Sequence, residues 1–527
     1  MSASHTRNAF FYSVIVTLGG FVFGLDLGVI AGTFSYISKQ FGLDDLQIGT
    51  VGAAPGLGAV FALLFAGPIC NKMGRKKSIQ LIALLYLVSA ICSALAPNYW
   101  TLVAARFLGG LAFCSLSLAA MYLGEITPSH LRGRMVAMNQ INIVIGITVA
   151  YLVNYLIQQG AESGAGYAET LGLETTAWRW MLGSEIIPAL AWLLLLFRIP
   201  ESPRWLMTQG REEEARKAMA KVLPMEQIDG EVEAINKSIA GSHGAKTGFQ
   251  QLKELFSRHA RKALIIGVTF AIIQPITGIN AIQTYAPMVF EQAGSADPLW
   301  NTIWLGVAGL FANILAFILV DRLGRRPVVN FGLIWCAVSL GLCGWAFHKA
   351  EYDFDKDAIA KISEEISPEA AASIEELGDK DFGSDLEFMK SMRTALGDET
   401  ADANKNFLIG QAAQLNTGLV LFAIVSFIAA FNLSIGPVMW VIFSEIFPTQ
   451  LRSIAIPAAH LVVAVVNYFV QWFFPWQLTN MGARDIFLFY CVWAVLGLIA
   501  LFILLPETKG KSIEEIEAEL NKGGKPS

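Results

Sequence analysis

Runs of roughly 20 mostly apolar residues recur about a dozen times along the 527-residue chain. Coiled as a helix, such a run crosses a hydrocarbon layer roughly 30 Å thick. The runs at 186–197 and 486–505 lack the apolar–polar alternation that a membrane-barrel strand requires. With 54% hydrophobic and 15% charged residues, the chain has too much apolar surface for a soluble fold. We therefore predict an all-α membrane protein with twelve transmembrane helices, near residues 10–32, 47–70, 78–96, 100–123, 135–157, 179–198, 262–290, 300–320, 327–348, 407–444, 453–477 and 484–505. We expect the long tenth span to bend at Gly436-Pro437.

Positive charges lie mainly in the short loops that follow the even-numbered spans. Because loops rich in Lys and Arg stay on the cytoplasmic side, we expect both termini to be cytoplasmic and the protein to lie in the plasma (inner) membrane. The net charge of −5 and the lack of a basic stripe argue against a nucleic-acid partner. The six cysteines have no metal-ligand spacing, so we expect neither a metal nor a cofactor.

Two polar segments divide the chain. A charged, helix-forming stretch separates the first six spans from the last six, and a strongly acidic stretch lies between spans nine and ten. We interpret the first as an intracellular linker and the second as a solvated external insertion with short helices. The expected organisation is an N-terminal six-helix bundle at 1–198, a linker at 199–260, a C-terminal six-helix bundle at 261–510 that contains the insertion at 349–405, and a cytoplasmic tail at 511–527.

Three short motifs occur twice, once beyond the corresponding spans of each half. The segment 125–132 matches 445–452 at five positions, Gly74-Arg75-Lys76 matches Gly324-Arg325-Arg326, and Pro200-Glu201-Ser202 matches Pro506-Glu507-Thr508. This repetition is typical of a transporter built from two related bundles.

The repeated motifs combine fixed cations with carboxylates at what we predict to be the cytoplasmic side. We expect ion pairs between the two bundles that break when the protein opens inward. The alternative is that the arginines only enforce topology, but this does not require carboxylates at repeated positions. The predicted gate residues are Arg75, Glu125, Arg132, Arg134, Glu201, Arg204, Arg325, Glu445, Arg452 and Glu507.

Two of these motifs extend into stretches specific enough to indicate a family. Residues 200–206 read Pro-Glu-Ser-Pro-Arg-Trp-Leu and 506–510 read Pro-Glu-Thr-Lys-Gly. With the paired Gly-Arg loops, they resemble the diagnostic motifs of the sugar porter family of the major facilitator superfamily. The segment 443–451 looks most like bacterial pentose and hexose proton symporters. The resemblance implies the major facilitator fold, with two pseudo-symmetric six-helix bundles, a central sugar site and alternating access. Sugar, proton and lipid bilayer are then the expected partners of a functional monomer.

Asp26 lies about midway along the first span. A carboxylate there costs roughly 2.5–3.5 kcal/mol on insertion scales, so it is a functional candidate by default. Arg106 in the fourth span is its expected partner, because a buried guanidinium is costly alone and stays charged. In the resembled family, proton symporters carry a similar acid and arginine, so we predict that Asp26 and Arg106 couple proton to sugar. The alternative is a static structural ion pair.

A sugar site requires amides for the hydroxyls and an aromatic face for the ring. Four residues match sugar-binding positions of the family, and Phe23 and Tyr285 resemble nearby aromatic lining. The four are Gln140, Gln274, Asn280 and Trp440, and Gly436, four residues before Trp440, also belongs to the predicted substrate site. A single amide is more often a contact between helices, but four at motif positions favour a substrate site.

The chain departs from the family pattern at Pro275, Gly309 and Val463, where the family usually has Gln or Asn. Three polar residues at other positions offer substitutes: Asn313, Asn432 and His460. Each could instead satisfy a neighbouring backbone group.

These features predict a proton-coupled importer of a monosaccharide or related polyol. A facilitative sugar uniporter is the alternative within the same class, and a sugar sensor without net flux is a less favoured alternative. We do not expect an enzyme, because we find no nucleophile–base pairing, metal cluster or phosphate-binding glycine loop.

Overall fold

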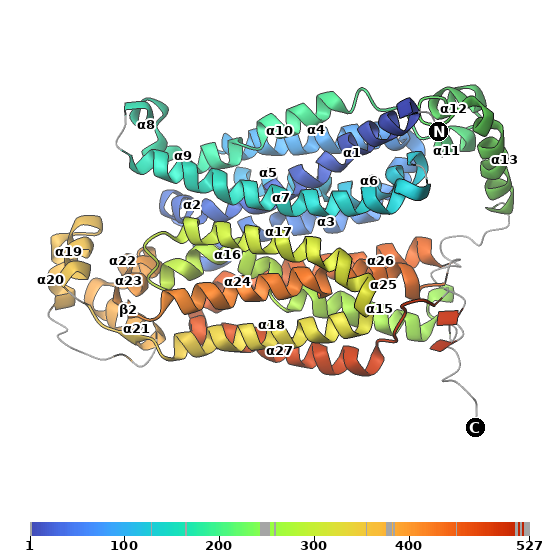
Figure 1. Cartoon of the computed structure of the whole chain (residues 1–527). Helices are drawn as coiled ribbons and strands as arrows, with labels where there is room; N and C mark the ends of the chain where they lie inside the picture. The colour runs from blue at the N-terminus through green and yellow to red at the C-terminus, as the bar shows by residue number, and fades with distance from the viewer. Residues whose placement is uncertain are drawn as a thin grey trace.

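The computed structural model describes residues 3–127, 129–163, 166–242, 253–257, 260–354, 356–375, 382, 385–448, 451–511, 515–516 and 519–520. The long helices lie side by side in two layers, one from each half of the chain (Figure 1). The start of α1, the end of α27 and the linker helices lie at one end of the layers, which we call the termini end. The segment between the ninth and tenth spans lies at the opposite end, the insertion end.

The N-terminal half runs from α1 to α10. Its elements are α1 (Ala3–Val29), η1 (Ile30–Gly32), α2 (Phe34–Phe41), α3 (Asp45–Met73), α4 (Arg75–Ala94), α5 (Tyr99–Leu111), η2 (Ala112–Cys114), α6 (Ser115–Ile126), α7 (Ser129–Glu162), α8 (Gly166–Leu171), α9 (Leu173–Gly183) and α10 (Ile186–Leu195). The linker that follows contains α11 (Pro203–Thr208), α12 (Glu212–Met219) and α13 (Met225–Ser242).

In the described part of the C-terminal half, eight helices lie outside the insertion. They are α15 (Arg261–Ile276), α16 (Ile279–Gln292), α17 (Pro298–Leu323), α18 (Arg325–His348), α24 (Thr417–Leu433), α25 (Ile435–Ile446), α26 (Arg452–Asn480) and α27 (Gly482–Leu504). The insertion contains β1 (Glu351–Tyr352), α19 (Lys356–Glu365), α20 (Pro368–Glu375), α21 (Asp385–Leu396), α22 (Asp398–Ala403), α23 (Lys405–Ala412) and β2 (Ala413–Gln414).

Eleven helices of the described residues are long and apolar enough to cross a membrane. The predicted sixth span is not among them because it is broken into α9 and α10, each too short to qualify alone. Large apolar side chains such as Ile187, Phe311 and Ile503 are exposed on the outside of the bundles. Exposed apolar surface of this kind is stable against lipid rather than water.

The seventh and tenth spans are interrupted helices. The seventh breaks at Thr277–Gly278, just after Pro275. The tenth breaks at Ser434, whose φ and ψ of −129° and −93° are not helical. The prediction of a bend at Gly436-Pro437 was wrong by two to three residues. A proline ring clashes with the carbonyl four residues earlier, so the helix breaks ahead of Pro437, which then lies in the first turn of α25.

The insertion consists of short helices, as predicted, and these helices pack into a subdomain with a core of its own. Its short helices bury a core that includes Ile362, Phe388 and Met392, and β1 pairs antiparallel with β2. Residues 405–412 form α23 of this subdomain, so the predicted start of the tenth span at 407 was also wrong. The amphipathic pattern of these helices, more than their acidity, explains the packing.

The insertion is attached mainly to the C-terminal half. The Asp385 carboxylate accepts a hydrogen bond of 3.0 Å from the Ala483 N–H in the first turn of α27. An exposed ion pair, Lys39–Glu365 at 3.0 Å, joins the insertion to α2 of the other half. Exposed pairs contribute little to stability, so the Asp385 contact is the stronger attachment.

The two halves touch each other toward the insertion end. A Cβ added at Gly49 of α3 would lie 2.0 Å from the Trp472 carbonyl oxygen of α26, so the two backbones are in direct contact. The Trp472 indole also donates a hydrogen bond of 3.1 Å to Thr50. Between α7 and α17, the rings of Tyr155 and Trp300 lie 5.2 Å apart.

Candidate substrate cavity and buried ion pair

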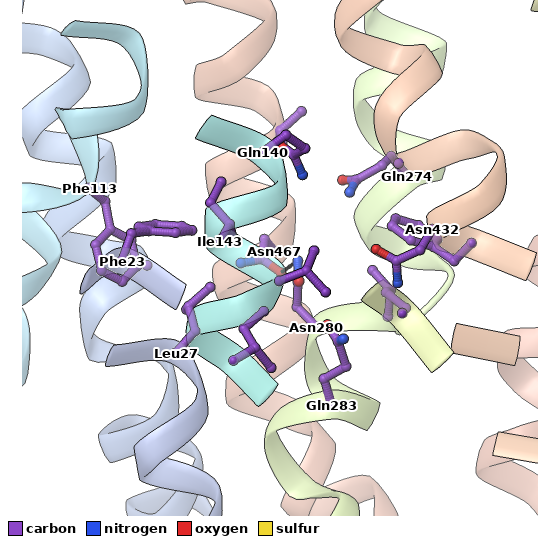
Figure 2. Close-up of a pocket in the computed structure, with 18 of the residues that line it drawn as sticks. Phe23, Leu27, Phe113, Gln140, Ile143, Gln274, Asn280, Gln283, Asn432 and Asn467 are labelled. Carbon is purple, nitrogen blue, oxygen red and sulfur yellow. Dashed lines mark hydrogen bonds between the residues drawn. The ribbon is translucent and has the colours of Figure 1, made fainter. Parts of the chain in front are cut away.

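A cavity of about 210 Å³ lies between the two halves. Its two walls differ in chemistry, as Figure 2 shows. The N-terminal half contributes mainly apolar side chains: Phe23, Leu27, Phe113, Ile143, Val144 and Ile147, with Gln140 as a polar exception. The C-terminal half contributes most of the carboxamides: Gln274, Asn280, Gln283, Asn313, Asn432, Asn467 and Gln471. An apolar wall opposite a polar wall fits a molecule with hydroxyls and an apolar face.

The break in the seventh span brings two of these amides into the cavity. Gln274 lies in the last turn of α15, and Asn280 lies in the first turn of α16. Asn280 donates a hydrogen bond of 2.8 Å from Nδ2 to Oδ1 of Asn467 on α26. Gln274 Oε1 is buried without a partner in the protein. An interrupted helix can supply such groups at the middle of a membrane because its backbone lines a cavity.

Nine of the ten predicted substrate-site residues line this cavity. They are Phe23, Gln140, Gln274, Asn280, Asn313, Asn432, Gly436, Trp440 and His460. Tyr285 does not: it is fully buried beside the cavity, where its ring stacks on Phe474 at 5.4 Å. Its ring also packs against Phe34 of the other half at 4.8 Å, so it forms part of the contact between the halves at the insertion end.

Aromatic rings lie on both sides of the cavity. Phe23 and Phe113 pack edge to face with centroids 4.6 Å apart. On the other half, Trp440 and His460 pack edge to face at 4.9 Å, and the Trp440 side chain remains 37% exposed. Trp440 is therefore the most exposed of these four rings.

Among the lining residues that the sequence did not predict are one aromatic ring and three carboxamides: Phe113, Gln283, Asn467 and Gln471. A signal was present for three of them. Gln283 follows Asn280 by three residues, and Gln471 follows Asn467 by four, so each pair shares one helix face. Phe113 lies in the 3-10 turn η2 between α5 and α6, which no helical spacing predicts.

Asp26 and Arg106 form the expected ion pair, from Arg106 Nη1 to Asp26 Oδ1. Arg106 Nη2 also donates to the Asp26 carbonyl oxygen at 3.3 Å. Only 1% of Asp26 and 2% of Arg106 are exposed, and neither lines the cavity. The residues Phe23 and Leu27 on either side of Asp26 do line it, so the ion pair lies behind the apolar wall in this conformation.

A third ionisable residue, Glu185, belongs to this buried cluster and was missed. It lies at the break between α9 and α10 and is 2% exposed. Its carboxyl group interacts with both Asp26 and Arg106, and Oε1 has no other partner. The signal was a glutamate inside the predicted span 179–198, where a charged residue is as costly as Asp26 is in the first span.

The repeated motifs of the N-terminal half come together in one cluster at the termini end. Arg75 Nε lies 3.1 Å from Glu125 Oε2, and Ser202 donates to the same carboxylate. Glu201 Oε1 accepts from the N–H groups of Arg75 and Lys76, both at 2.9 Å, in the first turn of α4.

The C-terminal half repeats this cluster residue by residue. Arg325 lies 2.9 Å from Glu445, and Thr508 donates to Glu445 Oε2 at 2.5 Å. Glu507 accepts from the N–H groups of Arg325 and Arg326, both at 3.1 Å. The equivalent glycines, Gly74 and Gly324, have φ of 90° and 95°, which favours glycine, and an added Cβ would meet the glutamate at 2.4 and 2.7 Å.

Each of these two ion pairs joins elements of the same half, so each repeated unit satisfies these charges by itself. Pairs between the halves, which we expect to break when the protein opens inward, stay a prediction. Arg452 donates to the Phe447 carbonyl oxygen at 3.2 Å, at the end of α25. Arg204 is exposed in α11. The side chains of Arg132 and Arg134 lie outside the described residues.

The cluster of the C-terminal half alters the acidity of Glu507. Partial burial alone would raise its pKa, but backbone N–H donors from Lys509, Arg325, Arg326 and Thr508 together lower the pKa of Glu507 below its ordinary value. Glu507 is thus held as a carboxylate against the N-terminus of α18, where the helix dipole favours a negative charge.

Fold and cavity together define a two-bundle membrane transporter. The chain matches the model of the sugar (and other) transporter family over residues 12–359 and 401–520, and it belongs to this family. The unmatched residues 360–400 fall within the insertion. The chain is therefore a multi-pass membrane transporter and not an enzyme.

Proteins with sequences similar to this one align with nearly the whole chain. The galactose-proton symporter of Escherichia coli (strain K12) is 30% identical, over 99% of this chain and 96% of that protein. The D-xylose-proton symporter of the same strain is 29% identical, over 97% and 95%. Among solved structures, the inward open conformation of the xylose transporter XylE from E. coli matches with a TM-score of 0.72 at 29% identity, over 97% of this chain and 99% of that chain.

Proposed function

We propose that this protein imports a monosaccharide or a related polyol by proton symport with alternating access. The observation that carries the proposal is the cavity between the halves, in which carboxamides face an apolar wall that covers a buried ion pair. The similarity to the galactose-proton and D-xylose-proton symporters supports the same substrate class.

In the proposed binding mode, Gln140, Gln274 and Asn280 form hydrogen bonds with sugar hydroxyls, and Trp440 packs against the apolar face of the ring. Phe23 and Gly436 shape the cavity around it. Gln274 supports this role because its buried Oε1 lacks a protein partner and is ready to accept a hydroxyl hydrogen.

The proposed coupling site is Asp26 with Arg106, extended by Glu185. Glu185 adds a second carboxyl group beside the Asp26–Arg106 pair, so the cluster is electrically neutral only when one proton is bound. A neutral cluster is the cheaper state in a low-dielectric interior. Because the cluster does not line the cavity here, we propose that proton exchange occurs in another conformation, after the halves have moved apart at the insertion end.

We propose that the termini end is cytoplasmic and that the protein works as a monomer in the cell membrane. The loop charges and the contacts between the halves at the insertion end support an inward-facing conformation in this structure. The two ion-pair clusters then hold the helix ends of each half together, so that each half moves as a unit. The proposed domains are the two bundles at 1–198 and 261–510, the linker at 199–260 and the tail at 511–527.

The test uses purified protein in liposomes with an imposed inward proton gradient. We expect the wild type to accumulate D-xylose or D-galactose, and a protonophore to abolish the accumulation. Asp26→Asn should still exchange sugar across the membrane but should no longer accumulate it. Asp297→Asn is the matched control, because Asp297 caps α17 outside the span and asparagine caps equally well. Unchanged accumulation by Asp26→Asn would instead support uniport with a structural ion pair, the alternative favoured by the closed position of Asp26.

A further inference from the structure

Asn313 is a fully buried residue of α17 whose carboxamide has no partner in the protein. Its exposed fraction is 0%, and neither Nδ2 nor Oδ1 makes a hydrogen bond within the protein. It nevertheless lines the cavity. A buried amide without partners costs free energy, and nearly all such groups in native proteins are satisfied. Asn313 therefore needs a partner that the protein itself does not supply.

A second carboxamide, Asn432 of α24, lies on the same side of the cavity. Gly309 is one helical turn before Asn313, and a Cβ added to Gly309 would lie 3.3 Å from Asn432 Nδ2. The missing side chain at Gly309 thus leaves the space that Asn432 occupies. Nδ2 of Asn432 donates to the Ile428 carbonyl oxygen at 2.9 Å, which leaves Oδ1 as its free acceptor.

We infer that Asn313 and Asn432 form a second carboxamide subsite, which binds two neighbouring hydroxyl groups at one end of the substrate. The inference rests on the proposed function and names part of its binding site. The two Oδ1 atoms accept hydrogen from hydroxyls, and Nδ2 of Asn313 donates to a hydroxyl oxygen. Asn280 and Asn467 differ from this pair because they already bond to each other.

The surroundings make this subsite selective. Apolar groups of Ile428 and Val144 lie 3.5 and 3.6 Å from the Cβ position of Gly309. These apolar groups offer no hydrogen bond in place of a missing hydroxyl, so a deoxy analogue leaves the amides without a protein or sugar partner. Sites that hydrogen-bond a hydroxyl therefore reject the analogue that lacks it.

The test measures sugar binding to purified protein by calorimetry. D-galactose, D-glucose, D-xylose and their monodeoxy analogues serve as probes, with Asn313→Leu as the variant. We expect Asn313→Leu to bind the preferred sugar about tenfold more weakly, the loss of roughly one hydrogen bond to a buried amide. The analogue that lacks the hydroxyl at this subsite should bind wild type and variant about equally. Gly309→Ala should weaken binding of the same sugar by displacing Asn432.

Asn330→Leu is the matched control, because Asn330 also has a buried Oδ1 without a partner but does not line the cavity. It should leave binding unchanged. If Asn313→Leu does not fold, Asn313→Thr replaces it. The inference is overturned if the Asn313→Leu variant binds every sugar as the wild type does and unfolds at a higher temperature. Asn313 would then be only a strained or water-bound core residue. If the wild type binds no sugar while remaining folded, the proposed function fails together with the inference.

Discussion

Replacing Glu507 by glutamine tests whether the repeated clusters stabilise their halves. Glu507 accepts hydrogen bonds from Arg325, Arg326 and Lys509 N–H groups at 3.1, 3.1 and 2.8 Å. Glutamine keeps one acceptor oxygen but loses the charge and the second acceptor. The N–H groups of its amide would face backbone N–H groups, and two donors cannot form a hydrogen bond. At least one of the three hydrogen bonds is therefore lost.

The expected cost follows from these bonds. A hydrogen bond to a charged group contributes roughly 1.5–3 kcal/mol. Because the cluster is partly solvated, we reduce this to about 1–2 kcal/mol of unfolding free energy. The equivalent substitution in the other half, Glu201→Gln, should have a similar effect, since Glu201 accepts from three N–H groups at 2.8–2.9 Å. Glu364→Gln, at an exposed position of the insertion, should have none.

The effect should also depend on pH. The folded-state pKa of Glu507 is lowered, so its stabilising contribution is present above the unfolded-state pKa of about 4.3 and is lost as the pH falls through the lower folded-state value. The difference between wild type and Glu507→Gln should therefore be largest near neutral pH and shrink below about pH 4. Reversible unfolding in mixed detergent micelles, followed by tryptophan fluorescence, measures it.

Two results would refute this reasoning. A Glu507→Gln variant as stable as wild type at neutral pH would mean that water replaces the lost bonds without cost. A difference that grows on acidification would mean that the carboxylate is destabilising where it lies, contrary to its backbone donors.

Three further predictions concern other parts of the molecule. Asp385→Ala should remove the acceptor for the Ala483 N–H and destabilise the docked insertion by about 1 kcal/mol. Hydrogen exchange should then be faster in the insertion alone, and unchanged exchange would contradict the contact. Gly49→Ala should push α3 away from the Trp472 carbonyl oxygen and favour opening at the insertion end, which distances between spin labels at that end would report. Trp440→Ala should raise KM for sugar roughly tenfold by removing the exposed ring, and an unchanged KM would exclude it from the site.

Much of the fold was predictable because its causes are local. Each span is recognisable from the length of its own apolar run, and each loop from its charge. The twelve-helix arrangement was therefore predictable without information on contacts between helices. The positions of helix breaks were less predictable. Pro437 indicated a bend in the tenth span, but the break itself lies at Ser434. Its position depends on the clash of the proline ring with the preceding turn.

The candidate site was predictable in part. Asp26 and Arg106 were paired correctly because each is too costly to bury alone. Glu185 was missed although it has the same cost, because its span was read as a single apolar helix rather than as two short helices with a polar break. Tyr285 was assigned to the cavity, yet helix rotation turns its ring into the contact with Phe34 and Phe474.

The sequence by itself determined the number of spans, the internal repeat and the residue types that a sugar site requires. Only the tertiary structure decided that the repeated charges pair within each half, that carboxamides gather on one wall of the cavity and that Asn313 lacks a partner. The reason is physical: hydrophobic length acts on each helix separately, whereas the partner of a side chain depends on the rotation and breaks of helices that pack against it.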